Sequence, residues 1–267
     1  MKIHRTYLII LPLVFFISCK GHVYRTPTAS MENTLMRDKS FYVTPANDFR
    51  KNDIVVFNYV GLDYVTKDKK TGQFIPNEHK RIYRLIAWSG DTLYIKDGEV
   101  FINGRHIPMP PKAKTDYEVF SKVHIDEFEQ NQDPYSSDIK QNGDTLVYTE
   151  SLTGEQVFDY EQRKPAILAV KRKVYPVNMN DTDYARASAA GTWSADYYGP
   201  LRIPSPGDAI FVDSINFKLY HNIPGILPGK NIIKEKLYFV LGDNRHAAED
   251  SRYIGLVSQS KMYGIVK

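Results

Sequence analysis

Residues 236–252 read KLYFVLGDNRHAAEDSR, an apolar run that ends in a Gly-Asp-Asn turn. The leucine, tyrosine, phenylalanine and valine side chains of the run are typical of a β-strand. Glycine, aspartate and asparagine favour a tight turn, because they accept unusual backbone angles or hydrogen-bond to their own main chain. We therefore expect a strand that leads into a turn, residues 242–252, crowded with polar and charged side chains.

Short runs of the same kind precede this stretch along the chain. The segments 41–44, 53–60 and 81–88 are rich in β-branched and aromatic residues and are divided by polar turns. The segment 91–104 predicts a hairpin across Asp97-Gly98, a pair that suits the tightest hairpin turns. The 19 Tyr and 13 Phe also favour β-structure. The sequence thus predicts an all-β fold of mostly antiparallel sheets.

The character of the sequence changes after the first strands. Residues 124–145 are polar and acidic, a basic stretch follows them, and β-rich sequence resumes near Asp196. We interpret 112–195 as an inserted subdomain with one short helix near Val119–Phe128, and both charge blocks as solvated faces. The insertion would divide the core into a first part, 24–111, and a second part, 196–267.

The N-terminus has the features of an export signal. Lys2 and Arg5 precede an apolar run that is short for a membrane span but fits a secretory signal, so we expect residues 1–18 to be a signal peptide. Cys19, the single cysteine, excludes an internal disulfide framework. It is either an ordinary cysteine after a cleaved peptide or, as we favour, the lipid-bearing residue of a lipoprotein-like N-terminus. Phe16 stands where such signals usually have leucine.

Composition and motifs exclude several classes of function. The net charge of +4 is small and dispersed, so we expect no nucleic-acid partner. The sequence contains no phosphate-binding loop, no HExxH pattern and no paired cysteines, so we expect neither a cofactor nor a metal. With a lipid on Cys19 and a tether over 19–29, the protein would be exported and membrane-anchored, facing the periplasm or the cell exterior; the leaflet stays open.

Five segments, in order, resemble the bacterial signal peptidase I family, in a divergent form similar to versions from the Bacteroides group. They are 29–35 (ASMENTL), 53–57 (DIVVF), 84–107, 196–204 and 242–255. The resemblance covers residues 24–107 and 193–267. Asn33 stands where the family has proline.

The resemblance implies a Ser/Lys dyad, in which a buried neutral lysine takes the proton of a serine that attacks a peptide carbonyl. The resemblance makes Ser30 the nucleophile. It also implies two oxyanion donors, the Ser30 amide and, beside it, the Thr28 hydroxyl. The family's lysine falls at Tyr83, and a tyrosine with a pKa near 10 is a poor base at neutral pH. The family's serine partner of that lysine falls at Ala248. Lys80 would face the opposite side of the strand.

The closing turn, residues 242–252, supplies both structural residues and a second candidate base. The resemblance implies a structural role around the site for Gly242, Asp243, Asn244, Arg245, Asp250 and Arg252. His246 lies in the same turn and has the pKa range of a general base, so we keep it as a less favoured alternative to the missing lysine. His79 and His106 are weaker candidates.

Three hypotheses follow from these residues. The first is a working serine endopeptidase, associated with the membrane, that removes signal peptides from exported precursors and whose activity Tyr83 would impair. The second is a pseudoenzyme, a non-catalytic lipid-anchored module that binds extended peptides or a membrane partner. The third is a surface β-protein that uses the scaffold for something unrelated, because a fold does not fix a function.

Overall fold

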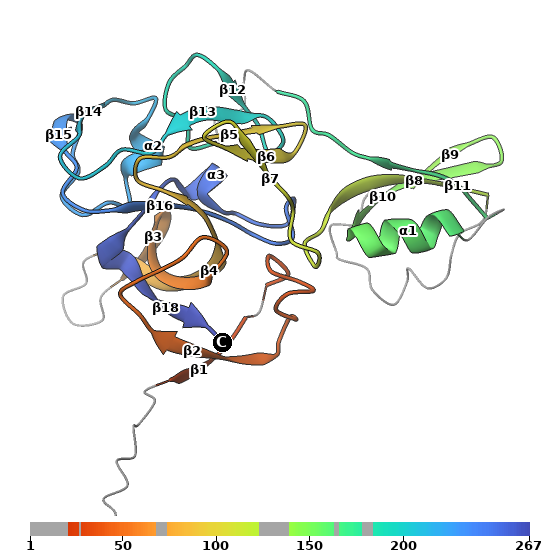
Figure 1. The fold of residues 1–267 in the computed structure, drawn as a ribbon, viewed down its shortest axis with the longest axis horizontal. Coiled ribbons are helices and arrows are strands. Elements are labelled where there is room, and N and C mark those ends of the chain that lie inside the picture. Colours follow the sequence, from red (N-terminus) through yellow and green to blue (C-terminus); the bar gives the residue numbers. More distant parts are fainter. Residues whose placement is uncertain (1–20, 27, 68–73, 123–138, 163–165, 178–183) are drawn as a thin grey trace, which may run out of the picture.

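The computed structural model describes residues 21–26, 28–67, 74–122, 139–162, 166–177 and 184–267 (Figure 1). All strand pairs among these residues are antiparallel. Helices are few and short. The predicted all-β class of mostly antiparallel sheets is therefore confirmed.

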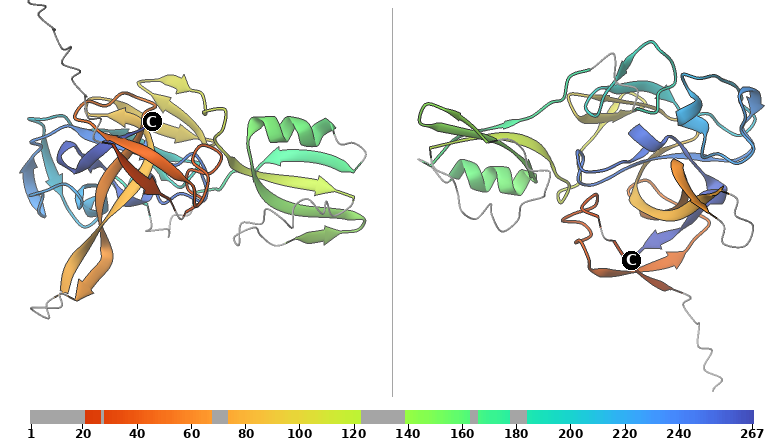
Figure 2. Two further views of the ribbon diagram at one scale, coloured as in Figure 1. Left: turned by 90° about the horizontal axis from the view of Figure 1, so that it is seen from below. Right: turned by 180° about the vertical axis from the view of Figure 1, so that it is seen from behind.

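A seven-stranded sheet forms the centre of the molecule, in the order β1-β2-β18-β3-β4-β16-β17. Its strands are β1 (His22–Arg25), β2 (Ser40–Pro45), β3 (Ile54–Lys67), β4 (Phe74–Trp88), β16 (Leu237–Leu241), β17 (Val257–Ser258) and β18 (Met262–Val266). Figure 2 shows that the far part of the β3–β4 hairpin extends away from the body. Along β16, Tyr238 and Val240 enter one buried apolar cluster and Phe239 and Leu241 another, as the alternation of side chains along a strand requires.

A second sheet covers one face of the first, in the order β12-β13-β5-β6-β7. Its strands are β5 (Thr92–Lys96), β6 (Glu99–Ile102), β7 (Arg105–Ile107), β12 (Thr192–Trp193) and β13 (Tyr198–Arg202). Asp97 and Gly98 connect β5 to β6 with φ angles of 52° and 74°. Positive angles at both central residues are what the tightest hairpin turn requires, so the predicted hairpin is confirmed.

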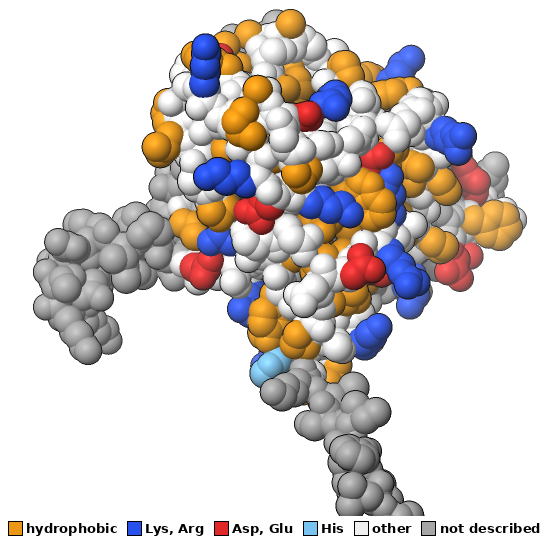
Figure 3. All heavy atoms as spheres, turned by 60° about the vertical axis from the view of Figure 1, so that its left-hand side comes forward, with side chains coloured by type: hydrophobic (Ala, Val, Ile, Leu, Met, Phe, Trp, Pro, Cys, Tyr) orange, Lys and Arg blue, Asp and Glu red, His pale blue; other side chains and the backbone are white. Residues whose placement is uncertain are grey.

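Short elements complete the core. They are the hairpin of β14 (Ala209–Val212) and β15 (Gly229–Ile232), the helices α2 (Phe217–Tyr220) and α3 (Ser251–Ile254), and a 3-10 turn at Gln259–Lys261. On the face drawn in Figure 3, basic and acidic side chains are interspersed with apolar ones, without a field of one sign. No helix within the described ranges is long and apolar enough to cross a membrane. The expected signal peptide, 1–18, and Cys19 lie outside those ranges.

A four-stranded sheet projects from this body, with α1 on one of its faces (Figure 1). It has the order β11-β8-β10-β9 and consists of β8 (Thr115–Ser121), β9 (Lys140–Asn142), β10 (Thr145–Leu152) and β11 (Ile167–Arg172), with α1 at Gly154–Gln162. Its own small cluster includes Val119, Tyr148, Leu152 and Ile167. β12, although it lies before Asp196, pairs with β13 in the second sheet.

The short helix expected near Val119–Phe128 is wrong at its start. Val119 lies in β8, where it packs against β10 and β11, and residues 123–138 are outside the described ranges. The helix instead begins after Thr153, whose hydroxyl accepts from the amide of Gln156 at 3.2 Å while the Gln156 side chain accepts from the Thr153 amide at 2.9 Å. This reciprocal cap is a signal that the sequence contains.

Candidate active site

Ser30 lies in a turn that follows β1 and is 8% exposed. The turn is closed by main-chain bonds from Glu32 to Ala29 (3.0 Å) and from Leu35 to Met31 (2.7 Å). The Ser30 hydroxyl lies 3.0 Å from the hydroxyl of Thr28. The structure thus brings together the two residues that the sequence assigned to the nucleophile and the oxyanion site.

The closing turn holds the main chain of Ser30 in place. The amide of Asn244 donates to the Ser30 carbonyl at 3.0 Å, and its side-chain amide donates to the Ala29 carbonyl at 3.2 Å. The carboxylate of Asp243 accepts from the Thr34 hydroxyl at 2.5 Å, farther along the same loop. Residues more than two hundred positions apart therefore form one unit around Ser30.

A paired arginine and carboxylate anchor this unit to β4. Arg84 donates to both oxygens of Asp243, at 2.8 and 2.6 Å. The Asp243 side chain is fully buried, and such two-point contacts are the strongest form of ion pair. Arg84 also donates to the Asn52 carbonyl at 2.8 Å, so it fixes three segments at once.

A second buried pair lies beneath the turn. Arg252 is 1% exposed and donates to both oxygens of Asp250, each at 2.8 Å. It also donates to the Ala195 carbonyl at 3.0 Å and to the Arg245 carbonyl. Asp250 in turn accepts from the Gly242 amide at 2.9 Å. Every charge of this pair is thus compensated, as burial demands.

Tyr83 occupies the position where the resemblance places the base. It is 4% exposed, and its hydroxyl donates to the Glu249 carbonyl at 3.0 Å. Arg81 lies 3.5 Å from the same hydroxyl and is held by the Glu249 carboxylate at 2.8 Å. Burial raises the pKa of Tyr83 to about 12, against the opposing effect of the Arg81 charge.

Gly242 marks the point at which the three key positions meet. A β-carbon on Gly242 would lie 2.2 Å from the Ala248 Cβ, 2.8 Å from the Ser30 carbonyl oxygen and 3.5 Å from Tyr83 Cδ1. Any side chain there would overlap its neighbours, which explains a glycine at this position. The Ser30 main chain, the Tyr83 ring and the Ala248 methyl group therefore all lie close to Gly242.

His246 lies away from this meeting point and joins the closing turn to the insertion. Its Nε2 is 3.0 Å from an Asp196 carboxylate oxygen, and its Nδ1 is 3.2 Å from the Asp116 amide and 3.5 Å from the Asp116 carboxylate. A neutral ring accepts from that amide, whereas a protonated ring pairs with the carboxylate. Burial alone lowers the pKa of His246, but its hydrogen bonds to Asp116 and Asp196 raise it above its usual value.

The remaining candidates lie elsewhere. Lys80 donates to Asn58 at 3.0 Å and its ammonium lies 4.4 Å from the centre of the Tyr263 ring, on the exposed face of β4. His79 packs against Tyr59, and His106 pairs with Glu99 at 2.7 Å. In the described part of the chain, no group of three His, Cys, Asp or Glu side chains is placed to hold a metal ion.

Asn33 adopts a backbone conformation that the family's proline cannot. Its φ angle is 70°, in the left-handed region, whereas the proline ring fixes φ near −65°. Asparagine is among the few side chains that tolerate this region. The loop after Ser30 therefore follows a path that the resemblance does not predict.

Sequence reasoning did not predict the residues that contact Tyr83 and those that contact His246. Glu249 binds Tyr83 and Arg81 across 166 and 168 positions, and Asp116 and Asp196 bind His246 across 130 and 50 positions. No local pattern connects such pairs, so their contacts follow only from the strand pairing.

A comparison with protein families identifies a family for this chain. A family model described as "Signal peptidase, peptidase S26" matches residues 1–267. Among curated proteins, none matches the chain.

Proposed function

The chain belongs to the S26 signal peptidase family, and we propose that it binds extended segments of exported precursors at Ser30 but hydrolyses them very slowly. The proposal treats it as a peptide-binding relative of the working peptidases. It separates two tasks that the family combines: holding a peptide across the serine, and taking a proton from that serine.

The nucleophile supports the binding part of this proposal. A serine attacks a carbonyl only when a neighbouring group takes its proton. Among the described residues, the hydrogen-bond partner of the Ser30 hydroxyl is the hydroxyl of Thr28, at 3.0 Å. A hydroxyl can stabilise an oxyanion, but it is no base at neutral pH. The Ser30–Thr28 pair is therefore suited to contacting a peptide carbonyl.

The Tyr83 phenol is the observation that carries the slow-hydrolysis part. Its proton is given to the Glu249 carbonyl, and burial raises its pKa to about 12. A pH of 7 is about five units below this pKa, so about one molecule in 100,000 carries a phenolate. Proton removal from Ser30 by this group would be correspondingly rare.

His246 does not supply the missing base in this account. Both ring nitrogens face Asp196 or Asp116, and the ring also packs on Tyr175, with centroids 4.7 Å apart. Serving Ser30 would require these contacts to break. We assign it a structural role between the closing turn and the insertion.

The working endopeptidase remains a second candidate, because the Ser30–Thr28 pair and the closing turn are assembled. A serine and oxyanion site without a base still give roughly a thousandfold acceleration over water in other serine peptidases. Slow, Ser30-dependent cleavage is thus compatible with the proposal, whereas physiological rates are not.

The test uses the full chain in lipid vesicles with a labelled exported precursor, and compares wild type with Ser30→Ala. We expect equal binding to both proteins and cleavage far below the one or more turnovers per second that peptidases typically reach. Ser30-dependent cleavage at such rates would overturn the proposal. Absence of binding to precursors would favour the third hypothesis, an unrelated use of the scaffold.

We further propose that a lipid on Cys19 anchors the protein to the membrane, outside the cytoplasm, through the tether 19–29. Residues 112–195 would form a separate subdomain, which is supported by a sheet whose strands all lie within that range. Replacing Cys19 with serine should move the protein from the membrane fraction to the soluble fraction. Unchanged membrane association would count against the lipid.

A further inference from the structure

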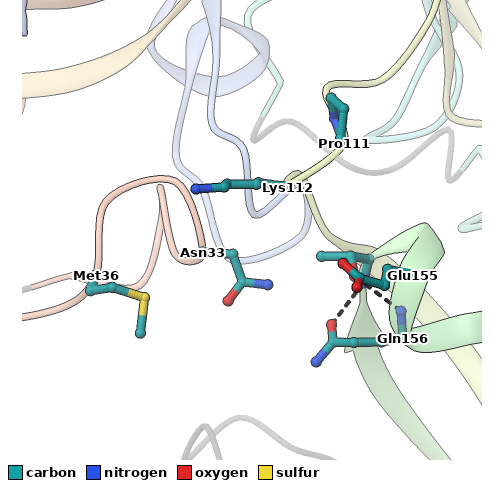
Figure 4. A pocket seen from close by; sticks show the side chains of 7 residues that line it. Asn33, Met36, Pro111, Lys112, Glu155 and Gln156 are labelled. Atoms are coloured by element: carbon teal, nitrogen blue, oxygen red, sulfur yellow. Dashed lines mark hydrogen bonds between the residues drawn. The ribbon is translucent and has the colours of Figure 1, made fainter. Parts of the chain in front are cut away.

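A cleft of about 290 Å³ lies between the loop that follows Ser30 and the insertion (Figure 4). Its lining is Asn33, Met36, Pro111, Lys112, Thr153, Glu155 and Gln156. Figure 4 shows Asn33 and Met36 on one side and the first turn of α1 on the other. The insertion therefore supplies one wall of a hollow whose other wall belongs to the candidate active site.

Chain connectivity places this cleft close to Ser30. Asn33 is three positions after Ser30, and three residues span at most about 11 Å. A bound peptide in an extended conformation advances about 3.3 Å per residue. A chain lying across Ser30 in the direction of the cleft would thus enter it at about its fourth residue from the scissile bond.

The cleft presents groups that suit a polypeptide. Met36 is 53% exposed and offers an adaptable apolar surface. Lys112 is exposed and makes no ion pair within the described part of the chain, so its ammonium is available to a carbonyl or a carboxylate. The Asn33 side chain projects into the opening (Figure 4). These groups combine one cation, one amide and one apolar contact.

The wall formed by the insertion is held firmly against the site. The Lys114 amide donates to the Asp243 carbonyl at 2.7 Å, and the Arg245 amide donates to the Lys114 carbonyl at 2.9 Å. The Lys114 ammonium pairs with Glu32 at 3.1 Å, which ties the insertion to the Ser30 loop. His246 adds its contacts to Asp116. A fixed wall is what a binding subsite requires.

We propose that this cleft is a subsite for the bound polypeptide, which the insertion adds to the Ser30 site. It takes the chain from about the fourth residue away from the scissile bond onward. Lys112 faces a carbonyl or an acidic side chain of the peptide, and Met36 packs against an apolar one. The inference rests on the proposed binding of peptides at Ser30.

The test is photo-crosslinking of the full-length wild-type protein with a set of precursor-derived peptides. Each peptide carries one photoreactive residue, moved position by position along both sides of the scissile bond, and mass spectrometry locates the attachment. We expect probes at the scissile bond to attach near Ser30. Probes four to six residues away, on one side of the bond, should attach to Met36 and its neighbours in the cleft.

The outcomes separate this inference from the proposed function. If scissile-bond probes attach near Ser30 and distant probes attach elsewhere, for instance at the exposed Phe158 of α1, the subsite is wrong while peptide binding at Ser30 stands. If no probe attaches near Ser30, the proposed function fails, and the subsite fails with it.

A charge reversal gives an independent measurement. Lys112→Glu should weaken binding of a peptide with an aspartate at the cleft position about fivefold, the size expected of a partly exposed ion pair. Lys140→Glu, on exposed β9 of the same insertion, makes the same change of charge and should leave the affinity unchanged. Equal effects of the two variants would overturn the assignment of Lys112.

Discussion

The closing turn and the base position, Tyr83, meet at Gly242, but the turn has the structural residues that the family resemblance implies, whereas the base position lacks the lysine. In the turn, Asp250 and Arg252 form a buried pair in which each charged group is hydrogen-bonded. At the base position, Tyr83 and Ala248 provide neither an amine nor a partner for one. The turn keeps its buried charges paired, whereas the base position, in the proposed function, no longer serves proton transfer.

This difference shows that the two regions answer to different physical demands. A buried charge without its partner destabilises a protein by several kcal/mol, so the ion pairs are required whether or not a peptide is cut. A base is required only for cutting. The Tyr83 phenol is buried with its hydrogen bond satisfied, so the fold does not require an amine at position 83.

The largest effect should come from breaking the buried pair. Asp250→Ala leaves the Arg252 guanidinium buried and uncompensated, so the free energy of unfolding should fall by about 3–5 kcal/mol in urea titrations. The matched control is Asp38→Asn, which removes the charge from an exposed ion pair at 3.5 Å to Arg25, keeps a side chain that tolerates the left-handed backbone there (φ 60°), and should change stability by less than about 1 kcal/mol. Similar small losses for both variants would contradict a structural role for the turn.

Proline, the residue that the family has at position 33, should destabilise the loop after Ser30. Asn33→Pro forces φ from 70° to about −65°, so we expect the free energy of unfolding to fall by more than about 1 kcal/mol. Asn33→Gly accepts the left-handed backbone and should stay within about 1 kcal/mol of wild type. If the proline variant is as stable as the glycine variant, this loop does not have the conformation described.

The contacts of His246 should make stability depend on pH. Its pKa is raised in the folded protein, so its contribution is fully present below about 6.5 and is lost as pH rises through the higher folded value. The facing groups are the carboxylates of Asp116 and Asp196, the Tyr175 ring, and Arg252 beyond Asp196. Unfolding titrations of His246→Gln against wild type should show a difference that shrinks at alkaline pH.

An exposed histidine provides the control for that titration. His106 also pairs with a carboxylate, Glu99, but its side chain is 48% exposed. His106→Gln should change stability only slightly at any pH, because exposed pairs contribute little. A His246 difference that grows with pH would have the wrong sign for this account.

Tyr83→Phe should have the smallest effect. It removes the hydroxyl that donates to Glu249 and leaves one carbonyl with a single remaining contact from Arg81, so stability should fall by about 1 kcal/mol. Any residual cleavage should be unchanged. A marked loss of cleavage would mean that the phenol takes part in the chemistry.

The same contrast shows what the sequence could predict. Local signals were sufficient for the antiparallel strands and the Asp97-Gly98 hairpin, because alternation and turn chemistry act over a few residues. Local periodicity failed at Val119, where pairing with β10 and β11 outweighs a weak helical pattern. The helix at Gly154–Gln162 begins with a capping pattern, Thr153 and Gln156, that is present in the sequence but was not used to predict it.

The site divides in the same way. The resemblance pointed to Ser30, Tyr83 and Ala248, and the structure brings these positions together around Gly242. The partners of His246 and the lock on Tyr83 could not be predicted, because each contact joins residues whose proximity depends on the whole topology. The left-handed Asn33 was equally hidden, since asparagine tolerates that conformation without requiring it.

Cleavage of an exported precursor by Tyr83→Lys/Ala248→Ser, beside wild type and the same double variant with Ser30→Ala, tests the central claim most directly. A general base contributes about a hundredfold or more, so we expect the double variant to cleave at least about 100 times faster than wild type, and the Ser30→Ala form to be inactive. Unfolding curves would establish that all three proteins are folded. Cleavage by wild type at the rate of the double variant would contradict the claim that Tyr83 has replaced the base.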